Sequence, residues 1–154
     1  MRRIWSVVTA VALPAALAGC TAAAAETHRP AEDGAADAVA DGEALWGRSF
    51  VAQRVTGDAE TESLLAGTEF TVSFDDGSIG AVADCNHMGG TVEPDGGRLA
   101  VTELFSTEMA CEEPAMAVDT WLIGFLESAP EYTLDGDTLT LTSEGVTVEL
   151  TESP

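Results

Sequence analysis

The chain has no lysine: its six cationic side chains are all arginine, against 27 Asp and Glu in 154 residues. The formal net charge of −21 excludes nucleic acid as a partner, because phosphate is repelled, and disfavours docking on an anionic bilayer. Cysteine and histidine are scarce, at three and two, which leaves few groups for nucleophilic or metal chemistry. The length allows one ordinary domain, and a hydrophobic content of 45% is enough for a packed core.

The first nineteen residues lack acidic side chains and lack the length of a transmembrane helix. Arg2 and Arg3 precede an apolar run over 4–16, which is shorter than the roughly 20 residues that a spanning helix needs. The run leads into Leu-Ala-Gly-Cys at 17–20, which resembles a bacterial lipobox. The resemblance implies a signal peptide over 1–19, cleavage before Cys20, and attachment of diacylglycerol and an acyl chain such as palmitate. The alternative is an ordinary signal peptide with an incidental cysteine.

A lipid anchor on Cys20 would place the protein in the cell envelope. We expect it on the outer face of the cytoplasmic membrane, or on the outer membrane if the host has two. Residues 20–44 have almost no large apolar side chain, and acids there far outnumber the single Arg29. Such a composition buries too little surface to offset the entropy of ordering. We therefore expect an acidic, disordered tether over 20–44, with a weak helix as the alternative, and a folded domain over 45–154.

Apolar and polar residues alternate in short segments of this domain, and turns such as Asp76-Gly77 separate them. The expected strands are 46–55, 68–74, 78–84, 99–104, 132–134, 138–142 and 146–150. The period changes over 114–129, where Met116, Trp121 and Phe125 indicate a helix between Pro114 and Pro130. The expected fold class is mainly β (α+β): an antiparallel curled sheet or small barrel of about seven or eight strands. One helix is inserted before the last three strands.

Several short motifs recur in order along 45–151. They are an opening Trp46, Cys85-Asn86 followed by Gly89, Thr-x-Met-Ala-Cys with Thr107, Met109 and Cys111, and a Tyr-x-Leu-x-Gly run from Tyr132. Together they resemble the META domain, the HslJ-like family of bacterial envelope proteins. The resemblance implies a compact β-rich fold and an association with envelope stress or antibiotic tolerance. It implies no enzymatic activity.

Cys85 and Cys111 are the two cysteines that remain if Cys20 carries lipid. An even pair in an exported protein indicates a disulfide, which would contribute roughly 3–4 kcal/mol in the chain-entropy model. A buried reduced pair and a redox-active pair are the alternatives, although the spacing is not the C-x-x-C that activates a thiolate.

His87, the sole histidine of 45–154, stands near Asp84 and Cys85, but the three or four converging ligands that zinc needs are not visible. We expect no metal, no cofactor, and His87 in a surface loop. Asn86 is expected to bond nearby backbone and so shape a turn. The acidic pairs at 75–76 and 135–137 are expected to be hairpin turns.

No catalytic constellation is visible, so we expect a protein without enzymatic activity. The expected function is that of a monomeric, lipid-anchored envelope protein, acting in stress tolerance or as a binding module for an envelope protein or a cationic ligand. The alternative is a small-ligand carrier that uses a barrel interior lined by Phe70, Phe74, Trp121 and Phe125; a filled interior would argue against it. A hydrolase or redox enzyme would need a reactive thiol at Cys85 or Cys111.

Overall fold

The computed structural model describes residues 42–154. The expected signal peptide, Cys20 and the tether up to residue 41 lie outside these residues. The elements are η1 (Gly42–Leu45), β1 (Arg48–Thr56), α1 (Ala59–Leu64), β2 (Thr71–Asp75), β3 (Ser78–Val82), β4 (His87–Asp95), β5 (Arg98–Ser106), α2 (Glu113–Glu127), β6 (Glu131–Asp135), β7 (Thr138–Ser143) and β8 (Val146–Ser153).

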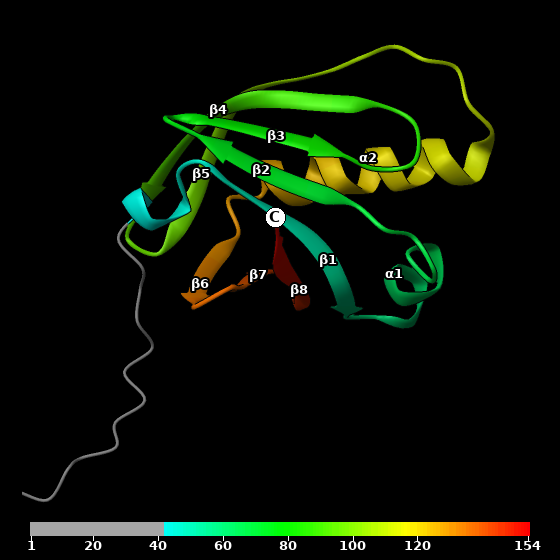
Figure 1. The fold of residues 1–154 in the computed structure, drawn as a ribbon. Coiled ribbons are helices and arrows are strands. Elements are labelled where there is room, and N and C mark those ends of the chain that lie inside the picture. The colour runs from blue at the N-terminus through cyan, green and yellow to red at the C-terminus, as the bar shows by residue number, and fades with distance from the viewer. Residues whose placement is uncertain (1–41) are drawn as a thin grey trace, which may run out of the picture. The chain divides into compact units, whose positions relative to one another are not determined.

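The eight strands follow one another around a closed antiparallel barrel, in the order β1 to β8 (Figure 1). Each strand pairs with the next along the chain, and β8 returns to pair with β1. An extra residue in β1, Gln53, shifts the register of this closing pair. The expected fold class is confirmed, since the helix α2 stands before the last three strands.

The barrel is uneven, because β5 and β6 barely pair. A single registered pair, Arg98 with Glu131, joins them. Two further backbone bonds, from the N–H of Leu99 to Pro130 and from the N–H of Tyr132 to Gly97, extend the contact by one residue on either side. The connection between these strands carries α2, which packs against β5 (Figure 1). Leu122 and Leu126 of α2 are fully buried, so the helix covers the opening that the strands leave.

The interior is filled by side chains from alternate strand positions. Phe50 and Phe74 meet edge to face, with ring centroids 6.1 Å apart. Trp121 of α2 stacks on Phe125 at 5.1 Å and contacts Phe70 at 6.1 Å. Aliphatic side chains fill the rest of the core: Val72, Ile79, Val92, Leu99, Leu139, Leu141, Val148 and Leu150. The aromatic residues considered as the lining of a carrier cavity therefore contribute to a packed core.

Four local features differ from the expectation. The short helix α1 was not expected; it begins at Asp58, whose Oδ1 accepts from the N–H groups of Glu60 and Thr61. The strand β4 was not expected either. The strand expected from residue 68 begins at Thr71. Residues 42–44, assigned to the tether, form a 3-10 turn that leads into the buried Leu45.

Candidate functional site

A buried polar cluster lies at the end of the barrel where the β3–β4 loop, the β5–α2 loop and α2 meet. Asn86, directly before β4, and Asp119, in the second turn of α2, are each about 3% exposed. Oδ2 of Asp119 accepts from the backbone N–H of Asn86 at 2.9 Å and from its side-chain Nδ2 at 2.8 Å. Because buried polar groups need partners, these two bonds fix α2 to the loop before β4.

The amide oxygen of Asn86 holds the loop after β5. Oδ1 accepts from the hydroxyl of Thr107 at 2.8 Å and from the N–H of Met109 at 2.9 Å. The hydroxyl of Thr107 in turn accepts from the N–H of His87 at 3.1 Å. A single side chain thus connects segments that are 21 to 33 residues apart. The expectation that Asn86 bonds nearby backbone is wrong: its side-chain partners are all distant in sequence.

A disulfide closes the same region. Cys85 and Cys111 are joined, with Cα atoms 6.2 Å apart, so the loop of Thr107 and Met109 is held at its far end as well. Sγ of Cys85 lies 4.0 Å from Sδ of Met116 in the first half of α2. The disulfide and the hydrogen bonds of Asn86 therefore restrain the same loop against the same helix.

The loop and the helix border an open pocket of about 360 Å³ next to this cluster. Its wall is formed by Asn86, Ser106, Thr107, Glu108, Met109, Ala110, Met116, Asp119, Thr120 and Ile123. Methionine, alanine and isoleucine side chains make much of this wall apolar. Asp119 contributes a polar group with an unused acceptor: among the described residues, its buried Oδ1 has no hydrogen-bond partner. An apolar wall with one or two placed polar groups is typical of small-ligand sites.

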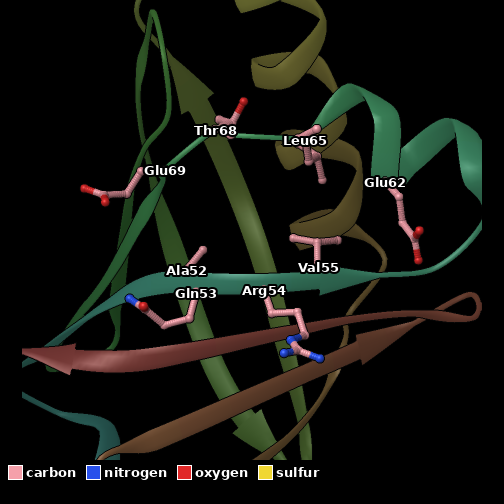
Figure 2. A pocket seen from close by; sticks show the side chains of 10 residues that line it. Ala52, Gln53, Arg54, Val55, Glu62, Leu65, Thr68 and Glu69 are labelled. Carbon is pink, nitrogen blue, oxygen red and sulfur yellow. The ribbon is translucent and has the colours of Figure 1, made fainter.

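A second pocket, of about 390 Å³, lies between β1, α1 and the segment 65–69. It forms because the pairing of β1 with β2 ends at Val51 and Thr71. Figure 2 shows Val55 and Leu65 pointing toward one another across it, whereas the charged side chains of Arg54 and Glu69 point away from that contact. The charged residues that line it, Arg54, Glu62 and Glu69, are all exposed. Among the described residues, the one buried side-chain acceptor without a partner belongs to Asp119, so the pocket beside Asn86 is the stronger candidate.

The structure places the expected site residues in different surroundings. Thr107, Asn86 and the backbone of Met109 share the cluster, and the side chain of Met109 is 48% exposed at the pocket. Trp46 is half-buried against the core. Gly89 lies outside the cluster, opposite Phe105 in the β4–β5 register. His87 is exposed, as expected, but it is the first residue of β4 and pairs with Val82, so its placement in a loop is wrong. Residues 42–154 contain no group of three His, Cys, Asp or Glu that could hold a metal.

Asp119 is the residue of this site that the sequence analysis missed. The apolar spacing over 114–129 indicates core packing, and that pattern by itself gives no role to a single acid within it. The available signal was its position: Asp119 follows the buried Val118 and stands three residues before the buried Leu122. It therefore lies on the buried face of α2, where an acidic side chain needs hydrogen-bond donors.

The fold and the cluster together define a class of protein. It is a small antiparallel barrel that one helix closes, and hydrogen bonds of Asn86 and Asp119 join this helix and two loops at the end of the sheet. The chain belongs to the META domain family, whose model matches residues 43–154. The resemblance carried by Trp46, Cys85-Asn86 and Thr107–Cys111 is thereby confirmed.

Solved structures share the fold. A protein from Burkholderia xenovorans, solved by NMR, matches with a TM-score of 0.57 at 16% identity, over 72% of this chain and 85% of that chain. A second NMR structure matches with a TM-score of 0.54 at 23% identity, over 73% of this chain and 94% of that chain. A DUF4847-family protein from Bacteroides vulgatus matches with a TM-score of 0.52 at 15% identity, over 71% of this chain and 94% of that chain. At sequence identities this low, the comparisons show a shared fold and nothing about function.

Comparison with curated protein sequences returns no match. Within residues 42–154, no helix is long and apolar enough to cross a membrane.

Proposed function

We propose that the protein is a non-enzymatic, lipid-anchored component of the bacterial envelope whose META domain acts as a binding module. The observation that carries the proposal is the pocket beside Asn86 and Asp119. Buried polar groups and a disulfide hold its loop and its helix in place. Of the two expected roles, stress tolerance and binding, binding is the one that this arrangement supports.

The packing of the core supports a site at the surface over a carrier cavity inside the barrel. Phe50, Phe70 and Phe74 occupy the interior and are at most 2% exposed. Cys85 and Cys111 are bonded to each other, so neither sulfur offers the thiolate that a hydrolase or redox enzyme of this sequence would need. These observations support binding over catalysis as the role of the domain.

The anchor is tested by the mass of the protein extracted from its own membrane. We expect a chain that begins at Cys20, carries acyl chains and is two hydrogens lighter than the reduced form. The Cys20→Ala variant is expected to leave the membrane fraction. A wild-type mass that still contains residues 1–19 would contradict the anchor.

The binding module is tested by photo-crosslinking in the native host. A benzoylphenylalanine at the position of Met109, on the pocket, is compared with one at Thr133, which is exposed on β6. We expect a reproducible adduct at 109 that is missing at 133. Equal adducts at both positions, or none at either, would contradict the binding of a partner protein at the pocket.

A further inference from the structure

The unused acceptor of Asp119 narrows the choice of ligand. The residue lies on α2 and lines the pocket. Both hydrogen bonds that its side chain accepts from Asn86 end on Oδ2, and Oδ1 is left without a partner among the described residues. A buried acceptor without a donor costs free energy, more so when the group is charged. A ligand that donates a hydrogen bond to Oδ1 would remove that cost.

The charges around the pocket favour a cationic donor. Within residues 42–154 the arginines are Arg48, Arg54 and Arg98, and each pairs with a carboxylate elsewhere on the barrel. None of them lines the pocket, whereas Glu108 does. Glu112 and Glu113 stand at the start of α2 and offset the partial positive charge of the helix end. A cation entering the pocket therefore meets acidic groups without a competing basic side chain.

The size and the wall of the pocket limit the rest of the ligand. About 360 Å³ is at the small end of the range for ligand sites, so the body must be small. Met109, Met116 and Ile123 present apolar surface to it. Oδ1 of Asp119 is buried from solvent, so a ligand reaches it only if the wall of the pocket shifts. Methionine side chains are unbranched and adaptable, so we expect Met109 and Met116 to be the parts of the wall that move.

We propose that this pocket binds a small organic cation with a primary ammonium group on an apolar body, and that Asp119 Oδ1 accepts a hydrogen bond from the ammonium. The proposal rests on the proposed function, because it names the ligand class of the same binding module. It identifies Asp119 as the ligand-binding residue and Met109, Met116 and Ile123 as the apolar wall.

The test uses the full chain in phosphatidylcholine nanodiscs, with methionine methyl groups labelled with ¹³C and empty nanodiscs as the blank. Met109 and Met116 report from the pocket, while Met88, buried in the core, serves as an internal reference. The probe is 2-phenylethylammonium. Two analogues accompany it: trimethyl(2-phenylethyl)ammonium, which keeps the charge and has no N–H donor, and 2-phenylethanol, which keeps a donor and has no charge.

We expect the primary ammonium to shift the Met109 and Met116 signals in a saturable manner, with Met88 unchanged. Each analogue should bind at least about tenfold more weakly, since a hydrogen bond to a charged group of this kind is worth that factor or more. Equal binding of the three compounds, or no shift with the primary ammonium, would overturn the proposal. This series uses the unaltered protein and does not depend on any variant folding.

A matched pair of variants assigns the effect to Asp119. Asp119→Asn keeps an oxygen for the two bonds from Asn86 and replaces the unused acceptor by an amide. This variant should bind the primary ammonium at least about tenfold more weakly than the wild type does. Asp76→Asn removes the same charge from the exposed β2–β3 turn and should leave binding unchanged. Binding by Asp119→Asn at wild-type strength would contradict the assignment.

The two proposals fail separately. The nanodisc titration reports on the pocket directly and needs no partner from the cell. A crosslink at Met109 in the host together with no ammonium binding would leave the binding module standing and overturn only the ligand class. Ammonium binding without any crosslink would overturn the protein-facing role and retain the pocket.

Discussion

The β6–β8 meander and the loop–helix face around Asn86 are held by different interactions. In the meander, consecutive strands pair residue by residue, from Glu131 with Thr142 to Ser143 with Val146. At the other face, side-chain hydrogen bonds and one disulfide join segments that are far apart in the sequence. The backbone ladder uses groups that every residue has, whereas the side-chain cluster depends on particular residues at particular positions. We therefore expect the meander to tolerate replacement of its polar side chains, whereas the cluster does not tolerate replacement of Asn86 or Asp119.

The largest expected effect is in the meander core. Leu141 is fully buried among strands of a closed barrel, which cannot collapse readily around a cavity. Leu141→Ala should lower the free energy of unfolding by about 4–5 kcal/mol, near the upper end for buried leucines. Denaturant unfolding measures it. Thr140→Ala, on the other face of the same strand, is the control, and a loss below about 1 kcal/mol for Leu141→Ala would contradict the packing described.

Removal of the disulfide comes next. The double variant Cys85→Ser, Cys111→Ser should lose roughly 3–4 kcal/mol, because the open chain regains loop entropy when it unfolds. Guanidinium unfolding with and without a reductant measures this loss. Reductant should lower the free energy of unfolding of the wild type by a similar amount and leave that of the double variant unchanged. A wild type that does not respond to reductant would instead indicate a reduced pair.

A smaller loss is expected from the polar cluster. Asn86→Ala removes the side-chain donor to Asp119, one of its two donors there, and the oxygen that accepts from Thr107 and Met109. It should cost about 2–3 kcal/mol of folding free energy. Asn86→Asp is nearly isosteric, yet it places an acceptor where Nδ2 now stands 2.8 Å from Asp119 Oδ2. It should cost at least as much as the alanine variant. Thermal unfolding compares the two variants. A smaller loss of stability in Asn86→Asp than in Asn86→Ala would contradict this prediction.

The smallest effect concerns pH. The hydrogen bond that Arg48 donates to Glu152 lowers the pKa of that carboxyl from its ordinary value of 4.5. Because the pKa is lower in the folded chain than in the unfolded one, the pair stabilises the fold above pH 4.5, and this contribution disappears as the pH falls through the folded pKa. Both side chains are partly exposed, so the effect is modest.

Glu152→Gln tests this ion pair. The thermal midpoint of the wild type should decline more steeply below pH 4.5 than that of the variant. Glu144→Gln, at an exposed residue of the β7–β8 turn, should retain the wild-type profile. Parallel profiles for the wild type and Glu152→Gln would show that the pair adds nothing in acid.

The sequence predicts the meander well because each of its strands shows the alternation that a half-buried strand imposes. Leu139, Leu141, Val148 and Leu150 all point inward as their spacing indicates. The helix α2 was predicted within two residues at either end, from Pro114 and Pro130 together with its apolar spacing. These elements depend on local pattern, which a single sequence contains.

The strand β4 escaped prediction because Gly89, Gly90 and Pro94 are poor strand formers. Its pairing with β3 and β5 on both sides overrides that preference. The helix α1 has six residues, too few to show helical periodicity. Its visible signal was the N-cap Asp58, whose carboxyl accepts from the first turn.

The site could be predicted only in part. The motifs identified Asn86, Thr107 and Met109, but the partner that joins them, Asp119, lies in a separate segment whose spacing indicates core. Hydrogen bonds between segments 33 residues apart have no period and no local signature. The position of an acid on an apolar helix face is the one clue, and it identifies the residue without identifying its partner.

The single registered pair between β5 and β6 makes one junction of the ring weaker than the others. Every other pair of neighbouring strands shares at least four registered residues. Local opening events should therefore begin at this junction, with the ends of β5 and β6 parting before the longer ladders break. In hydrogen–deuterium exchange, the backbone N–H groups of Leu99 and Tyr132, which bond across this junction, should lose their protection earlier than those of the β7–β8 ladder. When the two strands part, the bonds from Asn86 to Asp119 keep α2 over the junction, so the cluster that borders the pocket also protects the weakest part of the ring.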